Sequence, residues 1–376
     1  MKIVLPALAA LLMNLHSIYA CTDFLIGCQD GATVHGRTME FEFAFPWVVG
    51  VVPKGYKETA MLPENCQNHS PLTWFTRYKI LGIKSAGDFS NSNRSIVDGQ
   101  NEAGLSAGAL WFEGFTEYPD AVPEQHCSHS IPHMQLINYL LGNFATVEQV
   151  RTSFKYDIFP FVWGQYVTYW HGDIKINKYQ FPLHLSLADR SGDSIVIEYT
   201  KGKGRQVFDN KIGILTNSPP YDWHVLNLAN SINVQNQGYP AKHVTKQGRN
   251  YTIEAFWDGT GLLGLPGDFT PASRFLRTAA MIRFAEEAKN AKDGALKAWH
   301  IINSVDITKG TSEDYTVFSV VKDLTNNIMY FRAHDYISIR SIHLNKLSGE
   351  SGKQIPVEDT FENSVKDITE DFGDNW

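Results

Sequence analysis

The alternation of hydrophobic and polar positions predicts a chain built mainly from strands. Short apolar or alternating runs, bounded by Gly, Pro, Asn or Asp, have the length and composition of β-strands. The predicted strands cover residues 47–52, 104–112, 183–189, 194–200, 212–217, 315–323 and 328–333. Two more strands lie within residues 21–41, on either side of a Gln-Asp-Gly turn, and the turn at 190–193 joins two strands into a hairpin.

Apolar residues recur at helical spacing in the stretches 133–144, 146–154 and 270–294. The pattern is clearest in the last stretch, where Thr270 can cap a helix and Pro271 suits its first turn. Strands in hairpins with a few helices between them predict antiparallel sheets with helices packed outside, an α+β layer structure. No repeat or linker divides the chain, so residues 21–376 are predicted to form one domain, with 350–376 a loosely ordered acidic tail.

Residues 1–20 have the pattern of a signal peptide. Lys2 supplies a positive end, an apolar run follows, and the small residue Ala20 stands directly before Cys21. The apolar run is too short for a stable membrane anchor. We therefore expect export to the periplasm or the medium, a mature chain that begins at Cys21, and no stable insertion into a membrane.

Composition narrows the function classes. The chain has 376 residues, of which 43% are hydrophobic and 19% charged, and a formal net charge of −7. This balance argues against a nucleic-acid binder, and no glycine-rich nucleotide loop is present. Four cysteines are too few for a disulfide scaffold. Cys66 and Cys127 lie in polar stretches and can pair, whereas Cys28 is expected to be a small buried hydrophobe.

Cys21 carries the candidate chemistry. If cleavage exposes it, its thiol and its new α-amino group form a nucleophile and a general base on one residue. A cysteine at a cleavage site can instead be incidental or lipid-modified, although the bulky Tyr19 weighs against lipidation. His224 is an alternative base, as in a cysteine–histidine dyad. The histidines and cysteine of residues 126–133 match no standard zinc spacing, so no metal and no cofactor are expected.

Four stretches together resemble the choloylglycine hydrolases, a family of N-terminal-nucleophile cysteine amidases that includes bile salt hydrolases and penicillin V acylases. They are "CTDFLIGCQDGATVHGRTMEF", "DGQNEAGLSAGAL", "IGILTNSPPYDWHVLNLAN" and "GTGLLGLPGDFTPASRFLR". The resemblance covers residues 21 to about 345. It implies a four-layer αββα sandwich, a small-molecule acyl amide substrate and a homo-oligomer, a tetramer in this family.

The resemblance also assigns roles. Cys21 matches the family nucleophile, Arg37 the arginine beside the thiol, and Asn217 a side-chain donor of the oxyanion hole. Arg274 matches a second active-site arginine. Glu40 stands where the family has an aspartate that holds the α-amino group, so the carboxylate is kept on a stem one methylene longer.

Trp111 is the informative difference. Bile salt hydrolases carry asparagine at the matching position and some penicillin V acylases carry tyrosine. A tryptophan resembles what the acylases of Gram-negative bacteria in this family carry there. The backbone N–H there is the family's second oxyanion donor, and the side chain lines the pocket unless it is ordinary core. Met39 and Phe43 are possible further pocket residues, and Phe41, Phe45 and Trp47 lie in the same segment.

An apolar wall at Trp111 favours an aromatic or fatty acyl group over a hydroxylated sterol. The expected activity is therefore penicillin V acylase-like hydrolysis of a linear amide. The alternatives are a conjugated bile salt hydrolase, an acyl-homoserine lactone acylase, or a relative that binds acyl ligands without turnover.

Overall fold

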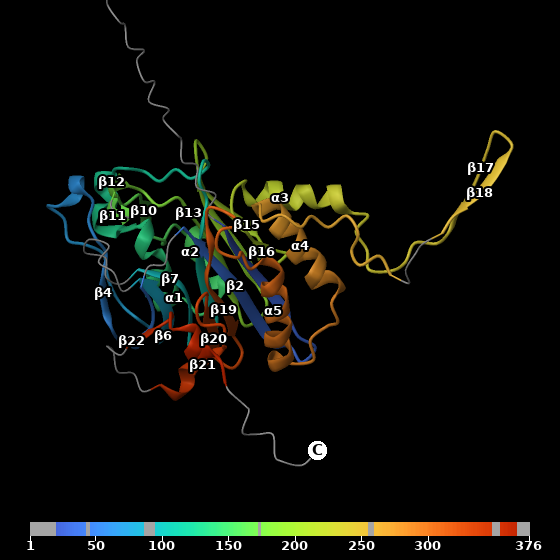
Figure 1. Ribbon diagram of the computed structural model, residues 1–376. Coiled ribbons are helices and arrows are strands. Elements are labelled where there is room, and N and C mark those ends of the chain that lie inside the picture. Colours follow the sequence, from blue (N-terminus) through green and yellow to red (C-terminus); the bar gives the residue numbers. More distant parts are fainter. Residues whose placement is uncertain are drawn as a thin grey trace, which may run out of the picture.

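Two antiparallel sheets lie face to face in the computed structural model of the chain, which describes residues 20–42, 46–85, 95–171, 174–254, 259–347 and 354–366 (Figure 1). The first sheet has the strand order β16-β1-β2-β19-β20-β21, and the second β15-β14-β13-β8-β7-β6-β3-β22. The strands of the first sheet are β1 Cys21–Gly27, β2 Thr33–Phe41, β16 Ile214–Leu215, β19 Tyr315–Asp323, β20 Ile328–Ala333 and β21 Arg340–His343. Those of the second are β3 Trp47–Val52, β6 Ile80–Ser85, β7 Ile96–Asn101, β8 Leu105–Trp111, β13 Leu183–Asp189, β14 Ser194–Thr200, β15 Gly204–Asp209 and β22 Gln354–Pro356.

The remaining described strands form two-stranded units: β4 Lys57–Thr59 with β5 Thr73–Phe75, β9 Ser130–Pro132 with β10 Phe161–Trp163, β11 Val167–His171 with β12 Ile174–Tyr179, and β17 Lys242–Lys246 with β18 Arg249–Ile253. The β17–β18 hairpin extends far from the body of the molecule (Figure 1). The α-helices are α1 Leu136–Asn143, α2 Val147–Lys155, α3 Tyr221–Asn227, α4 Pro271–Phe284, α5 Ala291–Val305 and α6 Phe361–Ser364. No helix in the described ranges is long and apolar enough to cross a membrane.

The helices complete a four-layer arrangement. Helix α5 packs on β2 and β19 and helix α4 on β1, while α1 packs on β7 and β8 and α2 on β13. Each sheet therefore has helices on one face and the other sheet on its second face, which buries both faces of the central strands; all nine residues of β2 are buried. The predicted α+β fold, a four-layer αββα sandwich, is confirmed.

Five predicted strands have the observed bounds, namely 47–52, 183–189, 194–200, 315–323 and 328–333. The strand predicted at 104–112 is observed at 105–111, and the one predicted at 212–217 shrinks to two residues. Five strands of the two main sheets were not predicted, namely β6, β7, β15, β21 and β22. Gly82 and Gly99 lie opposite each other in β6 and β7, and a Cβ on Gly99 would lie 2.8 Å from the backbone oxygen of Leu81. Glycine is required there by close backbone approach, but it weakens the local strand pattern.

The single helix predicted over 270–294 is wrong. Helix α4 ends at Phe284, and α5 begins only after Asn290, whose side chain accepts a hydrogen bond from Asp293 N. Between them, Ala288 O accepts from Gln29 N at 2.9 Å, and Ala288 bridges to Cys28. The connecting backbone is extended because it bonds to the β1–β2 turn instead of to a further helical turn. The N-cap position of α4 is Thr270, as predicted, but no side-chain capping bond forms there.

The described part of the acidic tail is docked, which corrects the expectation of a loosely ordered end for these residues. Strand β22 pairs with β3, Val357 is fully buried, and Glu358 accepts from the backbone nitrogen of Trp47. Residues 348–353 and 367–376 lie outside the described ranges, as do 1–19 of the predicted signal peptide.

The structure decides a cysteine pairing that the sequence left open and confirms the prediction for Cys28. Cys66 and Cys127 form a disulfide with a Cα–Cα distance of 5.4 Å. Cys28 is a free, buried thiol in the core between β1 and α5.

Candidate active site

Cys21 is the first residue of β1 and belongs to the buried core cluster that includes residues of both sheets. It pairs with Met39 of β2, and its side chain is buried, with Sγ 3.8 Å from Met39 Sδ. Its nitrogen is a peptide nitrogen here because Ala20 precedes it, and Ala20 N donates to Asp314 Oδ2. The peptide bond between Ala20 and Cys21 is thus held inside the site.

A mainly apolar pocket opens onto the thiol. It encloses about 700 Å³ of empty space, part of it open to solvent. Its lining residues are Cys21, Met39, Glu40, Phe41, Trp47, Ser85, Ser95, Val97, Ala109, Trp111, Met134, Phe181 and Leu183. Met39 is therefore placed in the pocket wall, whereas Phe43 and Phe45 lie outside the described residues.

Arg37 lies beneath the thiol with its guanidinium fully buried. Nη2 is 3.9 Å from Cys21 Sγ and 3.1 Å from Met39 Sδ, and it donates to Ala109 O. Burial raises the pKa of the Cys21 thiol, and the Arg37 charge opposes this by favouring the thiolate. A fixed cation at this distance is the arrangement that activates a cysteine.

Asn217 and Arg274 hold the backbone around Cys21. Asn217 Oδ1 accepts from Cys21 N at 2.6 Å and from Arg274 Nη2 at 2.6 Å. Asn217 Nδ2 donates to Trp111 O at 2.9 Å. Arg274 Nη1 also donates to Cys21 O and to Thr22 Oγ1, the latter at 2.7 Å. Residues distant in the chain thus converge on Cys21, as the sequence predicted.

Glu40 lies on the same strand as Arg37 but has a different partner from the one implied by the resemblance. Its Oε1 accepts from Thr316 Oγ1 at 2.6 Å, while its Oε2 is buried without a hydrogen bond. Burial raises the pKa of the Glu40 carboxyl to about 8, against the lowering effect of the Arg274 charge. In this state of the chain the carboxyl group is therefore mostly protonated at neutral pH.

Comparison with known proteins identifies the family. A family model described as linear amide C–N hydrolases, choloylglycine hydrolase family, matches residues 21–355. The chain belongs to the choloylglycine hydrolase family. It is 33% identical over 336 residues to a bile salt hydrolase/transferase of Clostridium perfringens, and the aligned region covers 87% of this chain and 93% of the relative. A penicillin V acylase of Pectobacterium atrosepticum is 30% identical over 254 residues, 64% of this chain and 58% of the relative.

Solved structures agree. A conjugated bile acid hydrolase from Clostridium perfringens superposes with a TM-score of 0.74 at 29% identity, covering 93% of this chain and all of the other. A penicillin V acylase from Agrobacterium tumefaciens shares the fold, with a TM-score of 0.69 at 21% identity and coverage of 93% and 98%. The chain is thus a linear amide C–N hydrolase with a small-molecule substrate, as the resemblance implied.

Trp111 of this hydrolase is both core and pocket wall. It is 6% exposed at the end of β8 and makes edge contacts with Phe41 and Phe181, at centroid distances of 6.0 and 5.5 Å. Its ring also stacks near Tyr179, and its Nε1 donates to Glu113 at 3.3 Å. The two interpretations of Trp111 offered by the sequence therefore hold together.

The histidine alternatives have other partners in the hydrolase. His224 Nε2 bonds to Asn217 O at 2.9 Å, and its ring stacks on Phe275. Burial lowers the pKa of His224 to about 4 and that of His133 to about 3. Cys127 is disulfide-bonded, and no metal-holding group of His, Cys, Asp and Glu side chains occurs among the described residues.

Sequence reasoning missed four polar residues around the site. Asp314 and Thr316 lie at the start of β19 and contact Ala20 and Glu40. Asp98 and Lys322 form a buried ion pair behind Arg37. Asp98 lies in a stretch that carried the family resemblance, but the strand pattern alone did not reveal which face its carboxylate occupies.

Proposed function

We infer that Cys21, once exposed as the N-terminal residue, is the nucleophile of amide hydrolysis and that its own α-amino group is the base. The observation that carries this is the placement of Cys21 Sγ in the pocket wall, 3.9 Å from Arg37, with its nitrogen held by Asn217.

The reaction follows from these groups. The α-amino group takes the thiol proton, and the sulfur attacks the amide carbonyl carbon. The C–N bond then breaks, the proton passes to the leaving nitrogen, and an acyl thioester remains on Cys21. Water, deprotonated by the same amine, attacks the thioester and releases the carboxylic acid and the free thiol.

The surrounding residues stabilise the charges that form in this reaction and position the reacting groups. Arg37 stabilises the thiolate, and one hydrogen of the Asn217 amide stabilises the tetrahedral oxyanion together with the backbone N–H of Trp111. Arg274 holds Asn217 and the Cys21 carbonyl in place. After cleavage the α-amino group of Cys21 remains within reach of Asn217 Oδ1, and we assign the second contact of this amine to the buried Glu40 Oε2, which has no hydrogen bond in the uncleaved chain.

Substitution of the nucleophile tests this function. Cys21→Ser is expected to remove nearly all amidase activity from a correctly processed, folded chain, because serine is a far weaker nucleophile at neutral pH. Activity is measured with penicillin V and with conjugated bile salts. A serine variant that keeps the wild-type rate would refute the assignment.

The mechanism requires export and cleavage after Ala20, which the pattern of residues 1–20 supports. Secretion to the periplasm or medium also suits the Cys66–Cys127 disulfide. N-terminal sequencing of the secreted protein is expected to read Cys-Thr-Asp-Phe. A chain that keeps residues before Cys21 and yet hydrolyses amides would contradict the role of the α-amine.

The substrate we favour has an aromatic or fatty acyl group. Trp111, Phe41 and Phe181 present ring faces and edges to the pocket, and an aromatic pair contributes about 0.5–1.5 kcal/mol beyond burial of area. A hydroxylated steroid would place polar groups against these carbons and lose hydration. Conjugated bile salts remain the second candidate because the Clostridium relative is named as a bile salt hydrolase/transferase.

A substrate panel decides between the two. We expect kcat/KM for penicillin V, and for long-chain acyl-homoserine lactones, to exceed that for glycine- or taurine-conjugated bile salts. Trp111→Asn is expected to narrow this preference. A wild type that prefers bile salts, with no shift in the asparagine variant, would overturn the acylase assignment.

The projecting β17–β18 hairpin, here called the arm, is suited to assembly of the hydrolase into a homo-oligomer. Strands β17 and β18 pair with each other, and Tyr251 and Ile253 are more than half exposed. A second copy of the chain is the occupant we favour for this arm, and the family resemblance suggests a tetramer. Light scattering of the wild type and of Tyr251→Lys/Ile253→Lys tests it, with a smaller assembly expected for the variant.

A further inference from the structure

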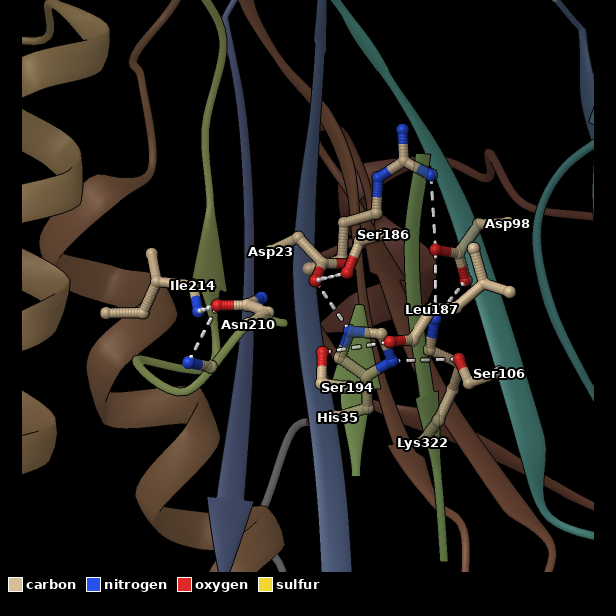
Figure 2. Close-up of polar contacts among 12 residues, drawn as sticks. Asp23, His35, Asp98, Ser106, Ser186, Leu187, Ser194, Asn210, Ile214 and Lys322 are labelled. Atoms are coloured by element: carbon tan, nitrogen blue, oxygen red, sulfur yellow. Dashed lines mark hydrogen bonds and ion pairs between the residues drawn. The ribbon is translucent and has the colours of Figure 1, made fainter. Parts of the chain in front are cut away.

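A layer of buried charges lies between the two sheets, directly behind Arg37. Lys322 Nζ from β19 lies 2.7 and 2.9 Å from the two carboxylate oxygens of Asp98 on β7. Arg37 Nη1 approaches the same carboxylate from another side, at 3.1 Å, and donates to Val97 O at 2.7 Å. Figure 2 shows the Asp98–Lys322 contact crossing from one sheet to the other.

The charge balance of this group is unusual. One carboxylate lies between two cations, and all three side chains are fully buried. If Asp98 faced Arg37 alone, the pair would be neutral, and the field of Arg37 at the thiol would be largely cancelled. With Lys322 on the carboxylate, the group of three keeps one net positive charge, and the low dielectric of the interior strengthens its effect.

The chain makes room for this arrangement at Gly108 of β8. A Cβ there would lie 2.9 Å from Asp98 Oδ2 and 3.2 Å from Arg37 Nη1. Glycine thus allows the carboxylate and the guanidinium to meet beside the strand. A side chain at position 108 would occupy the space in which the Asp98 carboxylate and the Arg37 guanidinium meet.

A second polar pair adjoins the first. Asp23 Oδ1 is 2.6 Å from His35 Nε2 and accepts from Ser186 Oγ at 2.6 Å, and His35 Nδ1 is 2.8 Å from Ser106 Oγ (Figure 2). Burial opposes ionisation of the Asp23 carboxyl, but the contacts with His35 and Ser186 and the charge of Lys322 outweigh it and hold the pKa of Asp23 below its usual range. Asp23 Oδ1 thus has partners of its own, whereas Asp23 Oδ2 is buried without a hydrogen bond, and the Asp23 charge acts on Arg37 together with that of Asp98.

We propose that Lys322 is a positioning residue for the hydrolysis: it balances the charge of Asp98, so that Asp98 fixes the guanidinium of Arg37 without cancelling its positive charge at the Cys21 sulfur. This inference rests on the proposed function, in which the thiolate of Cys21 attacks the amide. Lys322 contacts neither the thiol nor the pocket in the described structure and acts through Asp98 and Arg37.

The other ionisable groups near the thiol remain in place when Lys322 is changed. Glu40 and Arg37 face Cys21 from β2, and Arg274 reaches its carbonyl oxygen from α4. Asp314 contacts the preceding residue from the start of β19. Asp23 and its partner His35 also lie in the buried charged layer and respond to Lys322. A change in the titration of the thiol after substitution of Lys322 therefore reports the charge of this whole layer behind Arg37, and the Asp98 variants isolate the part that passes through Asp98.

The test measures the pH dependence of Cys21 alkylation by iodoacetamide in the mature enzyme, followed by mass spectrometry of the Cys21 peptide. Lys322→Met removes the charge and keeps much of the volume. We expect the pH at which alkylation reaches half of its maximal rate (the midpoint) to rise by about 0.5–1 pH unit in this variant. Below that pH, alkylation is then slower by roughly 3- to 10-fold. The pH profile of kcat/KM is expected to move in the same direction, while Lys322→Arg keeps the wild-type midpoint.

Two further variants separate charge from damage to the fold. Asp98→Asn leaves both cations, so its midpoint is expected to fall, whereas Asp98→Asn/Lys322→Met keeps one net positive charge and should return close to wild type. Should Lys322→Met not fold, the difference between these two variants still isolates the Lys322 charge. Lys201→Met, at an exposed lysine, is the matched control and should leave the midpoint unchanged.

Equal midpoints in wild type and Lys322→Met, or in Asp98→Asn and the double variant, would overturn the proposal. The alkylation readout needs no substrate. It therefore fails or succeeds separately from the proposed function, which Cys21→Ser tests by activity.

Discussion

Asn217 links both ends of the site through one amide group. Its oxygen accepts from Cys21 N and Arg274, and its nitrogen donates one of two hydrogens to Trp111 O. The second hydrogen is the one we assign to the oxyanion. Asn217→Ala is therefore expected to lower kcat by roughly 10²–10³, with a smaller change in KM.

Steady-state kinetics on penicillin V check this prediction, with Asn217→Asp as the control. Aspartate keeps an acceptor for the Cys21 nitrogen but offers no donor and adds a negative charge, so its kcat should fall at least as far. An aspartate variant with wild-type kcat would exclude the oxyanion role, and an effect on KM alone would make Asn217 a substrate-binding residue.

His224 links the site to the pH dependence of stability. Burial lowers its pKa to about 4, below the value near 6.5 expected in an unfolded chain. The unfolded state then binds a proton first as the pH falls, so the stability contributed by His224 is present above pH 6.5 and is lost towards pH 4. The loss for this residue is about 3 kcal/mol.

Urea unfolding between pH 7 and pH 4.5 measures this loss. His224→Gln keeps an N–H donor for Asn217 O but does not titrate, so its stability should fall less steeply with pH than that of the wild type. His133 titrates in both proteins, which leaves part of the slope. Parallel curves for the two proteins would contradict the prediction.

At the scale of single elements, helix α5 depends on a glycine for its contact with the sheet. A Cβ on Gly294 would lie 2.8 Å from Cys28 Sγ and 3.1 Å from Val34 Cγ2. Alanine improves helix propensity by about 1 kcal/mol, but overpacking of a rigid core costs about 1–3 kcal/mol. Gly294→Ala is expected to be destabilising, and Gly294→Ala/Cys28→Ala should recover much of the loss in denaturant unfolding. If the double variant is the less stable one, the Cys28 contact is not the cause.

At the scale of the whole molecule, the disulfide joins Cys66 and Cys127, which lie 61 residues apart in two short 3-10 helices and form a small cluster with Val122 and Trp163. None of these residues lines the active-site pocket. Cys66→Ala/Cys127→Ala is expected to lower the free energy of unfolding by about 2–4 kcal/mol while kcat/KM stays at the wild-type value. Urea unfolding and kinetics on the same preparation check both halves, and a large loss of kcat/KM in the folded variant would show that these two segments support the pocket.

The sequence by itself determined the elements whose signal is local. Short apolar or alternating runs bounded by turn residues placed β3, β13, β14, β19 and β20 at their observed bounds, because these patterns depend only on near neighbours in the chain. The motifs around Cys21, Arg37, Asn217 and Arg274 identified residues that the structure brings together, and they identified the family.

Only the tertiary structure decided which buried residues contact these site residues from the side away from the pocket. Both faces of β2 are buried, so alternation does not tell which face meets the other sheet. Asp98 and Lys322 are 224 residues apart, and their contact exists only because β7 and β19 belong to two sheets packed face to face. The break at 285–290 likewise depends on a hydrogen bond to the distant Gln29. Such contacts are fixed by the packing of layers, which no local pattern of residues contains.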